Sequence, residues 1–321
     1  TVVTEFNKKY PACHIELKSD YEDTTLLTEL IAGEGPVLID TSLTGFDNHQ
    51  VLWEPLDKVL EELEIMDELQ NSALEIGKIN GELYGIVTNF WLETLIINNS
   101  DQRDWNYEEF LKCIDSNSEL KAIVNSEYLE DDGLRFVSNF LVHGMGDNYF
   151  FDEQTGEVII NNDRFRRMLQ YIKKYCVRAD FVSPGEALLE GKVLCNTLKI
   201  NRPEQMGLYR VCYGEDINYI GFPGNEGANN YLNSFAPLAI RKSASKEEKT
   251  LACAFIKLLL SYDCQQRLTK DVNFCLSIRK DILEEQINSV DENSLVYAKG
   301  FETMALGDKV DNRKDGEKLY T

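Results

Sequence analysis

The chain alternates between two hydrophobic periods, and this alternation limits the folds that it can adopt. Residues 2–10 carry apolar side chains at helical spacing and end at Pro11, whereas residues 14–18 alternate as a strand does. The order repeats in residues 24–32, which favour a helix, and in residues 37–39, a short apolar run typical of a buried strand. Because helices that alternate with strands cover open sheets, we expect an α/β fold.

The same alternation continues to the C-terminal third, where the strongest helical pattern lies. Residues 251–260 form an apolar stripe, Ser243 or Ser245 can cap the helix, and Glu247 favours its positive end. Further helices are predicted over residues 105–113, 132–142, 164–176 and 184–190. A hairpin is predicted over residues 79–84, and further strands are predicted over residues 93–98, 158–160, 192–198, 218–222 and 235–240.

Length and charge bound the classes of protein to which the chain can belong. At 321 residues it exceeds the size at which one hydrophobic core usually stops growing, so we expect two domains. The 55 acidic residues outnumber the 33 basic ones along the whole chain, for a net charge of -22. Nucleic acids and anionic membrane surfaces need a basic stripe, and both are excluded as partners.

The eight cysteines are predicted to be buried free thiols that behave as small hydrophobes. They are isolated from one another, with no C-x-x-C pair and no zinc-ligand spacing, so no metal site is expected. A disulfide framework is the alternative. The eight are Cys13, Cys113, Cys176, Cys195, Cys212, Cys253, Cys264 and Cys275.

Motifs of catalysis and of cofactor binding are missing from the sequence. It contains no G-x-S-x-G elbow, no phosphate-binding loop and no H-E-x-x-H, and its three histidines lie far apart. Adjacent acidic pairs such as Glu61-Glu62 invite a glycosidase hypothesis, because two carboxylates suffice for that reaction. They lie in helical patterns, where neighbouring side chains point about 100° apart, as on a solvated face. We therefore expect a protein that is not an enzyme and needs no cofactor.

Polar residues at strand ends are the candidate binding residues. Asp40 and Ser42 directly follow the buried strand 37–39, and ligands of open α/β sheets bind beyond the carboxyl ends of strands. A carboxylate binds hydroxyl groups well, although Asp40 could instead cap a helix.

Aromatic residues beside amides form the second candidate group. Asn89, Phe90 and Trp91 precede the predicted strand 93–98, and Asn230 and Tyr231 repeat the pairing in a glycine-rich loop. An aromatic face covers the apolar CH surface of a sugar ring, while amides satisfy its hydroxyls. Burial in a core is the alternative for each aromatic ring.

The order of five segments resembles that of family 1 extracellular solute-binding proteins of ABC importers. The segments are Val3–Pro11, Leu30–Asp40, Gly77–Thr88, Tyr219–Gly224 and Pro237–Leu260. No single segment is specific, and the resemblance rests on their order. The family's usual first strand precedes the opening helix and is absent here, so we expect a leader, an anchor or that strand to come before Thr1.

The resemblance implies a two-lobed periplasmic-binding-protein-like fold of type II. Each lobe would be an open mixed sheet flanked by helices, and a hinge would join the lobes. Lobe 1 is expected to comprise residues 1–97 and 235–288, and lobe 2 residues 98–234 and 289–321.

The resemblance also implies a function and a set of contacts. The chain would be an extracytoplasmic monomer, lipid-anchored or secreted, that captures a mono- or oligosaccharide by hinge closure and delivers it to an ABC transporter permease. A carboxylate-dependent glycosidase and a ligand-sensing module without transport are the alternatives. The implied ligand contacts are Asp40, Ser42, Asn89, Phe90, Trp91, Glu93, Asn139, Asn201, Asn230 and Tyr231.

Overall fold

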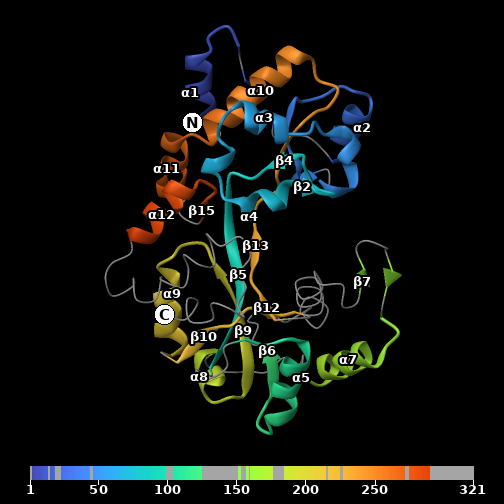
Figure 1. The fold of residues 1–321 in the computed structure, drawn as a ribbon, viewed down its shortest axis with the longest axis vertical. Coiled ribbons are helices and arrows are strands. Elements are labelled where there is room, and N and C mark those ends of the chain that lie inside the picture. Colours follow the sequence, from blue (N-terminus) through green and yellow to red (C-terminus); the bar gives the residue numbers. More distant parts are fainter. Residues whose placement is uncertain are drawn as a thin grey trace. The chain divides into compact units, whose positions relative to one another are not determined.

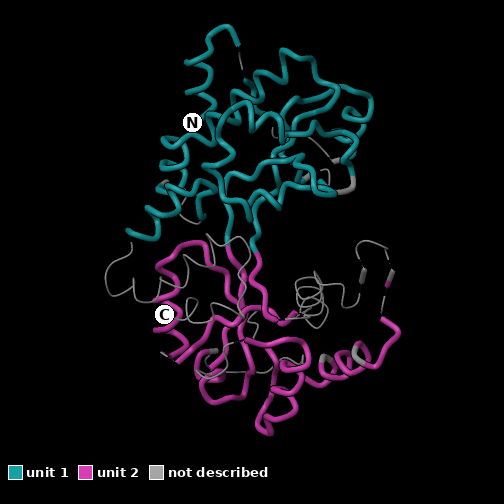
Figure 2. Tube along the Cα trace, in the orientation of Figure 1, with its two compact units in different colours: residues 1–91, 232–289 teal, residues 92–231, 290–321 magenta. Residues whose placement is uncertain are grey.

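A computed structural model gives the structure of the chain, which divides into two units. Unit 1 comprises residues 1–91 and 232–289, and unit 2 comprises residues 92–231 and 290–321 (Figure 2). The lobe limits expected from the sequence stay a prediction. The structure describes residues 2–13, 15–18, 23–43, 46–98, 104–124, 151–152, 157–158, 160–175, 184–214, 216–224, 227–271 and 275–289.

Unit 1 is built on a three-stranded sheet with the order β1-β14-β4. Strand β14 (Leu238–Ile240) pairs antiparallel with β1 (Leu38–Asp40) on one side and with β4 (Gly85–Ile86) on the other. The register places Asp40 beside Leu238, and Leu238 beside Ile86. The core next to this sheet comprises Leu26, Leu30, Ile39, Phe46, Trp53, Ile79, Tyr84 and Ala239.

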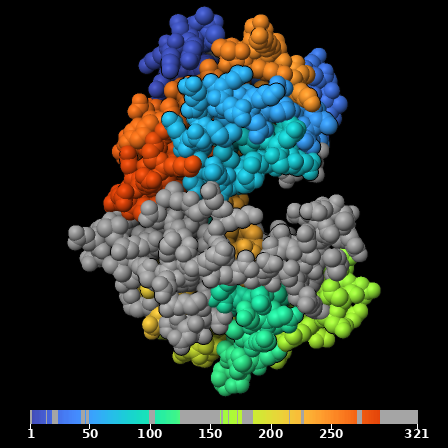
Figure 3. Space-filling view, in the orientation of Figure 1, coloured from blue at the N-terminus to red at the C-terminus, as the bar shows by residue number. Residues whose placement is uncertain are grey.

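Helices of both halves of unit 1 pack on one another. The rings of Phe255 in α10 (Lys246–Leu259) and Phe6 in α1 (Val2–Lys9) meet at 5.4 Å between centroids and 84° between planes. The two helices pack on one another, and Figure 3 shows the dark blue N-terminal segment against the orange segment. The other helices are α2 (Asp23–Ile31), α3 (Asp57–Glu62), α4 (Asn71–Leu74), α11 (Tyr262–Asp271), α12 (Lys280–Asn288) and the 3-10 turns η1 (Thr41–Leu43), η2 (Asp47–Leu52), η3 (Met66–Glu68) and η4 (Glu75–Gly77).

Ser245 is the residue that caps α10. Its hydroxyl accepts a hydrogen bond from the Glu248 N–H at 3.2 Å, and the Glu248 carboxylate accepts one from the Ser245 N–H at 2.7 Å. The other predicted cap, Ser243, is occupied elsewhere, because its hydroxyl accepts from Arg241 and donates to the Gly33 carbonyl. The capping box therefore forms at the second of the two serines.

The strand predicted over residues 14–18 does not form. Residues 15–18 lie in no strand, and His14 lies outside the described residues. The Asn7 side chain accepts a hydrogen bond from the Ile15 N–H at 2.8 Å and donates one to the Ile15 carbonyl at 3.1 Å. One amide thus satisfies the backbone groups that a neighbouring strand would otherwise pair.

Strand β5 (Asn89–Asn98) is longer than predicted and belongs to both units. The sequence placed Asn89, Phe90 and Trp91 before a strand at 93–98, and that boundary is wrong. They are in the strand because β15 (Leu276–Ser277) pairs with Phe90 and Asn89. A tight hairpin precedes β5, formed by β2 (Lys78–Ile79) and β3 (Glu82–Leu83).

Unit 2 holds a mixed sheet with the path β10-β5-β9-β6. Strands β10 (Ile217–Tyr219) and β9 (Val193–Ile200) flank β5 in antiparallel pairing, and β6 (Ala122–Val124) pairs in parallel with β9. Strand β13 (Tyr231–Asn233) also pairs with β5.

The helices of unit 2 cover a core that surrounds Trp105 and Tyr107. Helix α8 (Pro184–Leu189) packs against β9 and α9 (Gln205–Tyr213), which can be followed in Figure 1. The helix predicted over 132–142 lies outside the described residues. The remaining elements are α5 (Tyr107–Ser116), α7 (Asp163–Tyr175) and the hairpins β7 (Phe151–Asp152) with β8 (Glu157–Val158) and β11 (Phe222–Pro223) with β12 (Ala228–Asn229).

Candidate functional site

The end of β1 in unit 1 exposes Asp40 and Ser42 beside a buried threonine. Thr41 is buried, and both its N–H and its hydroxyl donate to the Pro237 carbonyl, at 3.2 and 2.8 Å. The Asp40 carboxylate accepts a hydrogen bond from the Ser42 N–H at 3.0 Å. Asp40 thus caps the turn that follows the strand, while its carboxylate stays exposed to bind a hydroxyl donor.

Two aromatic rings meet in unit 1 at the start of β5. Trp91 is 8% exposed, and its ring meets that of Phe235 at 5.4 Å between centroids and 73° between planes. Phe235 is 63% exposed. The strand predicted over 235–240 begins only at Leu238, so Phe235 lies in the segment that leads into it. Phe90 is completely buried and belongs to the core.

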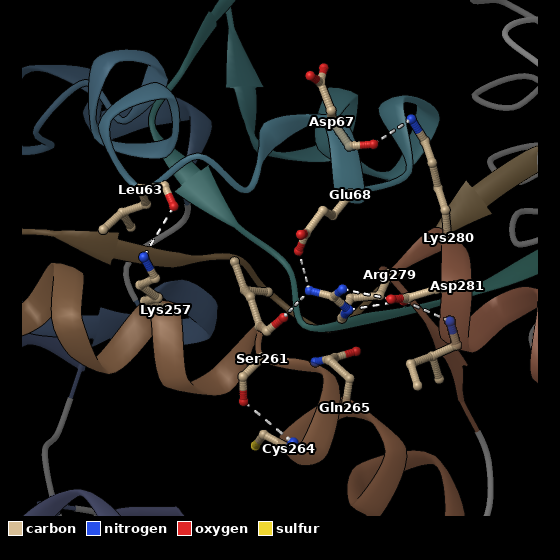
Figure 4. A network of polar contacts seen from close by, with 12 residues as sticks. Leu63, Asp67, Glu68, Lys257, Ser261, Cys264, Gln265, Arg279, Lys280 and Asp281 are labelled. Carbon is tan, nitrogen blue, oxygen red and sulfur yellow. Dashed lines mark hydrogen bonds and ion pairs between the residues drawn. The ribbon is translucent and has the colours of Figure 1, made fainter. Parts of the chain in front are cut away.

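Strand β15 fixes the first residues of β5, and a buried arginine lies next to β15 in the chain. Arg279 donates to Glu68 at 2.5 Å, to Asp281 at 2.6 and 2.9 Å, and to the Leu260 carbonyl at 3.1 Å (Figure 4). Its own N–H donates to the hydroxyl of Ser277, the β15 residue opposite Asn89. We call these contacts the Arg279 network.

The candidate binding residues of unit 2 include Asn230, which lies in residues 227–231. We call this segment the Asn230 loop. The two polar atoms of the Asn230 amide are buried and find no hydrogen-bond partner among the residues that the structure describes. The loop passes close to Gly221, whose φ is +81°. A Cβ atom at Gly221 would lie 2.9 Å from the Asn229 carbonyl oxygen and 3.3 Å from Asn230 Oδ1. A glycine is therefore required for this approach.

Residues 104–107 anchor the segment on which the Asn230 loop lies. The Trp105 indole N–H donates to the Gly221 carbonyl at 3.0 Å, and the Asp104 carboxylate accepts from the Ala228 N–H at 2.7 Å. The Tyr107 N–H donates to the Gly224 carbonyl at 2.9 Å. Three hydrogen bonds from one short segment thus fix both strands of the β11–β12 hairpin before Asn230.

The other predicted contacts of unit 2 lie along β5, β9 and β13. Glu93 is half-buried, and the register sets it opposite Lys199. Asn201 follows β9; its N–H donates to Gln205, and its buried Oδ1 has no partner in the described part of the chain. The half-buried Tyr231 ring meets Phe222 edge-on at 5.3 Å. Asn139 lies outside the described residues.

Three of these residues share one property, a buried amide oxygen without a hydrogen-bond partner among the described residues. Like Asn201 and Asn230, Asn89 has a buried Oδ1 without a partner in the described ranges, although its Nδ2 donates to Thr88 at 3.4 Å. We call these three residues the unpaired amides. A buried polar group without a hydrogen bond costs about 1–3 kcal/mol, which makes each of the three a candidate position for a ligand hydroxyl.

Sequence reasoning found the three amides but missed residues that shape their surroundings. Phe235 was taken as part of a strand, although the following Ala236-Pro237 hinted at an irregular entry. Trp105 holds Gly221, and Gly221 lies against the Asn230 loop. Because Trp105 is 116 residues away from Gly221 in the sequence, no local pattern could reveal its role.

Among the described residues, no group of three or more His, Cys, Asp or Glu side chains could hold a metal ion. The described carboxyl groups with a clearly displaced pKa are Asp115, Glu248 and Asp281. The pKa of Asp115 is lowered chiefly by the Tyr171 hydroxyl, and that of Glu248 by the Ser245 backbone. Burial alone would raise the pKa of Asp281, but Arg279 outweighs it and lowers the pKa. Lowered pKa values suit structural carboxylates and not a general acid.

In the part of the chain that the structure describes, no helix has the length and apolar character to cross a membrane.

Comparison with known proteins gives one relative by sequence. No protein-family model matches the chain. The arabinooligosaccharide-binding protein of Bacillus subtilis (strain 168) is 26% identical over 192 residues, which cover 54% of this chain and 42% of that protein. The chain therefore spans less than half the length of this curated relative.

Several solved structures share the fold over almost the whole chain. A Streptococcus pneumoniae solute-binding protein in complex with the blood group A-trisaccharide has a TM-score of 0.55 at 14% identity, covering 96% of this chain and 82% of that one. A cyclo/maltodextrin-binding protein complexed with maltotetraose has 0.54 at 17%, with 99% and 91% covered. A Mycobacterium tuberculosis protein in complex with glycerophosphocholine has 0.51 at 14%, with 99% and 91% covered. The chain thus has the two-lobed α/β fold of periplasmic-binding-protein-like proteins, as the sequence predicted.

Proposed function

We propose that the chain is an extracytoplasmic solute-binding protein that captures a mono- or oligosaccharide and delivers it to the permease of an ABC transporter. The unpaired amides are the observation that carries this proposal. Each presents buried hydrogen-bonding atoms without a protein partner in the described ranges, and sugar hydroxyls both donate and accept hydrogen bonds. Proteins of the same fold, described in complex with a trisaccharide and with maltotetraose, support it.

The charges at the proposed contacts favour a neutral ligand. Asp40 is an exposed residue with a carboxylate, and Glu93 is half-buried at the position of β5 opposite Lys199 of β9. A negatively charged ligand would be repelled by the exposed carboxylate of Asp40. A neutral sugar can donate hydroxyl hydrogen bonds to that carboxylate instead.

Hinge closure is the proposed mechanism. The chain passes from unit 1 to unit 2 after Trp91 and returns after Tyr231, and these crossings lie in the paired strands β5 and β13. A few residues at such crossings can absorb the backbone change of a domain closure. We also propose binding without covalent change, because a glycosidase needs a carboxyl group whose pKa is raised and the described carboxyl groups with a displaced pKa have lowered ones.

Calorimetric titration tests this proposal with four ligands. Maltotetraose, blood group A-trisaccharide, an arabinooligosaccharide and glycerophosphocholine are each titrated into the protein, with a thermal denaturation scan beside each. We expect at least one saccharide to bind and to raise the melting temperature by mass action, and glycerophosphocholine to do neither. Binding of glycerophosphocholine alone would contradict the assignment to sugars.

Two further assays separate the proposal from its alternatives. Incubation with chromogenic glycosides should release no chromophore, and turnover would make the chain a glycosidase. The liganded protein should stimulate ATP hydrolysis by its permease in vesicles. Stimulation of a sensor kinase in its place would identify a sensing module.

A further inference from the structure

Phe235 differs from every other described residue of its kind. Among the phenylalanines and tryptophans whose burial the structure describes, it is the exposed one, at 63%, whereas Trp53 and Trp105 are completely buried. Exposure of a large flat apolar ring is unfavourable in water, so its retention on a surface needs a reason.

The backbone around Phe235 is fixed on both sides. The Ser234 N–H donates to the Asn233 side chain at 2.8 Å, and the Ser234 hydroxyl donates to the Phe235 carbonyl at 2.5 Å. Two residues further on, the Pro237 carbonyl accepts both hydrogen bonds of Thr41. Trp91 then meets the ring edge-on at 5.4 Å. The exposed ring is therefore carried by an anchored segment.

Sheet register brings hydrogen-bonding groups to the same end of unit 1. Strand β1 ends at Asp40, which lies beside Leu238, and β4 ends at Ile86, which also lies beside Leu238. Phe235 lies three residues before the start of β14, and Asn89 begins the strand that follows β4. One end of this sheet thus carries an exposed carboxylate, an amide acceptor and an exposed aromatic ring.

We propose that Phe235 is a ligand-stacking residue, which covers the apolar CH face of a sugar ring while Asp40 and Asn89 bind its hydroxyls. Trp91 supports the Phe235 ring from the side. The inference rests on the proposed function and adds a contact that the sequence did not indicate. It also narrows the ligand to a saccharide in which one ring displays an uninterrupted apolar face.

Substitution of Phe235 tests the stacking. With the saccharide that binds wild type most tightly in the titration above, Phe235→Ala should raise Kd at least about tenfold. Phe235→Trp should keep the affinity within about threefold, and Phe235→Leu, which retains apolar bulk without a flat face, should resemble Phe235→Ala. Val51→Ala, at another exposed apolar residue of unit 1, is the matched control and should leave Kd unchanged.

Tryptophan fluorescence gives a readout that a merely structural role would not change. The chain has three tryptophans, and Trp91 is the one that contacts Phe235. Saccharide binding should change the fluorescence of wild type, and Trp91→Phe, measured at a saturating saccharide concentration, should remove most of that change.

The outcomes separate the two proposals. Saccharide binding by wild type with an unchanged Kd in Phe235→Ala would overturn the role of Phe235 and leave the function intact. Absence of binding by wild type to every saccharide would overturn both. A thermal scan of each variant confirms that it is folded.

Discussion

The Arg279 network and the unpaired amides are two sets of buried polar groups, and they differ in how fully they are satisfied. Every nitrogen of the Arg279 guanidinium donates to a named acceptor, on Glu68, Asp281 or the Leu260 carbonyl. Asn230 has neither amide atom bonded within the described residues. Since a satisfied network stabilises the chain by itself and an unsatisfied amide does not, the difference separates groups that hold the fold from groups suited to a ligand.

The largest expected effect is on stability. Arg279→Met should lower the free energy of unfolding by about 2–4 kcal/mol, because the Leu260 carbonyl loses the hydrogen bond from Arg279 and the carboxylates of Glu68 and Asp281 lose the cation that they share. Urea denaturation measures it. Arg267→Met is the matched control; its ion pair with Glu5 is about half exposed, and its loss should lower the free energy of unfolding far less than the loss of Arg279 does. Equal losses of unfolding free energy in the two variants would contradict a special role of the Arg279 network in stability.

The unpaired amides should behave in the opposite way. Asn230→Leu should weaken saccharide binding by about tenfold, which is about 1.4 kcal/mol, because the saccharide hydroxyl that binds the Asn230 amide loses its hydrogen-bond partner. Stability should stay constant or rise, since a buried unpaired amide is removed. Calorimetry and urea denaturation on the same samples measure both. In the control Asn98→Ala, an amide of β5 that donates to the Leu189 carbonyl is removed, and the affinity should not change.

The smallest expected effect concerns pH. Because Arg279 holds the pKa of Asp281 below its ordinary value of 3.8, the ionised carboxylate stabilises the folded state. This contribution is complete above the ordinary pKa and is lost as the pH falls through the lowered one. Asp281→Asn should therefore show a smaller loss of stability below about pH 4 than wild type does. Glu61→Gln, at an exposed residue of α3, should follow the wild-type profile; an Asp281→Asn profile that also does so would argue against the coupling.

Much of the architecture could be predicted from local patterns. The helices at 2–9 and 246–259 and the strand at 38–40 follow from periodicity and caps that lie within each segment. The strand expected at 14–18 failed because the Asn7 side chain took its backbone groups. A local pattern cannot foresee such a competitor.

The candidate site divides in the same way. Amides and carboxylates near strand ends could be read from the sequence, since residue type and position suggest hydroxyl binding. Which of these side chains have hydrogen-bond partners could not be predicted, because the partners come from elsewhere in the chain. Ser277 of β15 lies opposite Asn89 in the strand pair, and Trp105 donates to Gly221 in the segment before Asn230.

The sequence by itself determined the alternation of helices and strands, the exclusion of polyanionic partners and the residue types available to a polar ligand. These properties follow from composition and from contacts a few residues apart. Only the tertiary structure decided that Phe235 is exposed, that Phe90 is buried, and that Arg279 is satisfied while the Asn230 amide has no partner among the described residues. Burial and hydrogen bonding depend on which distant segments the fold brings into contact, and here those segments lie up to about two hundred residues apart.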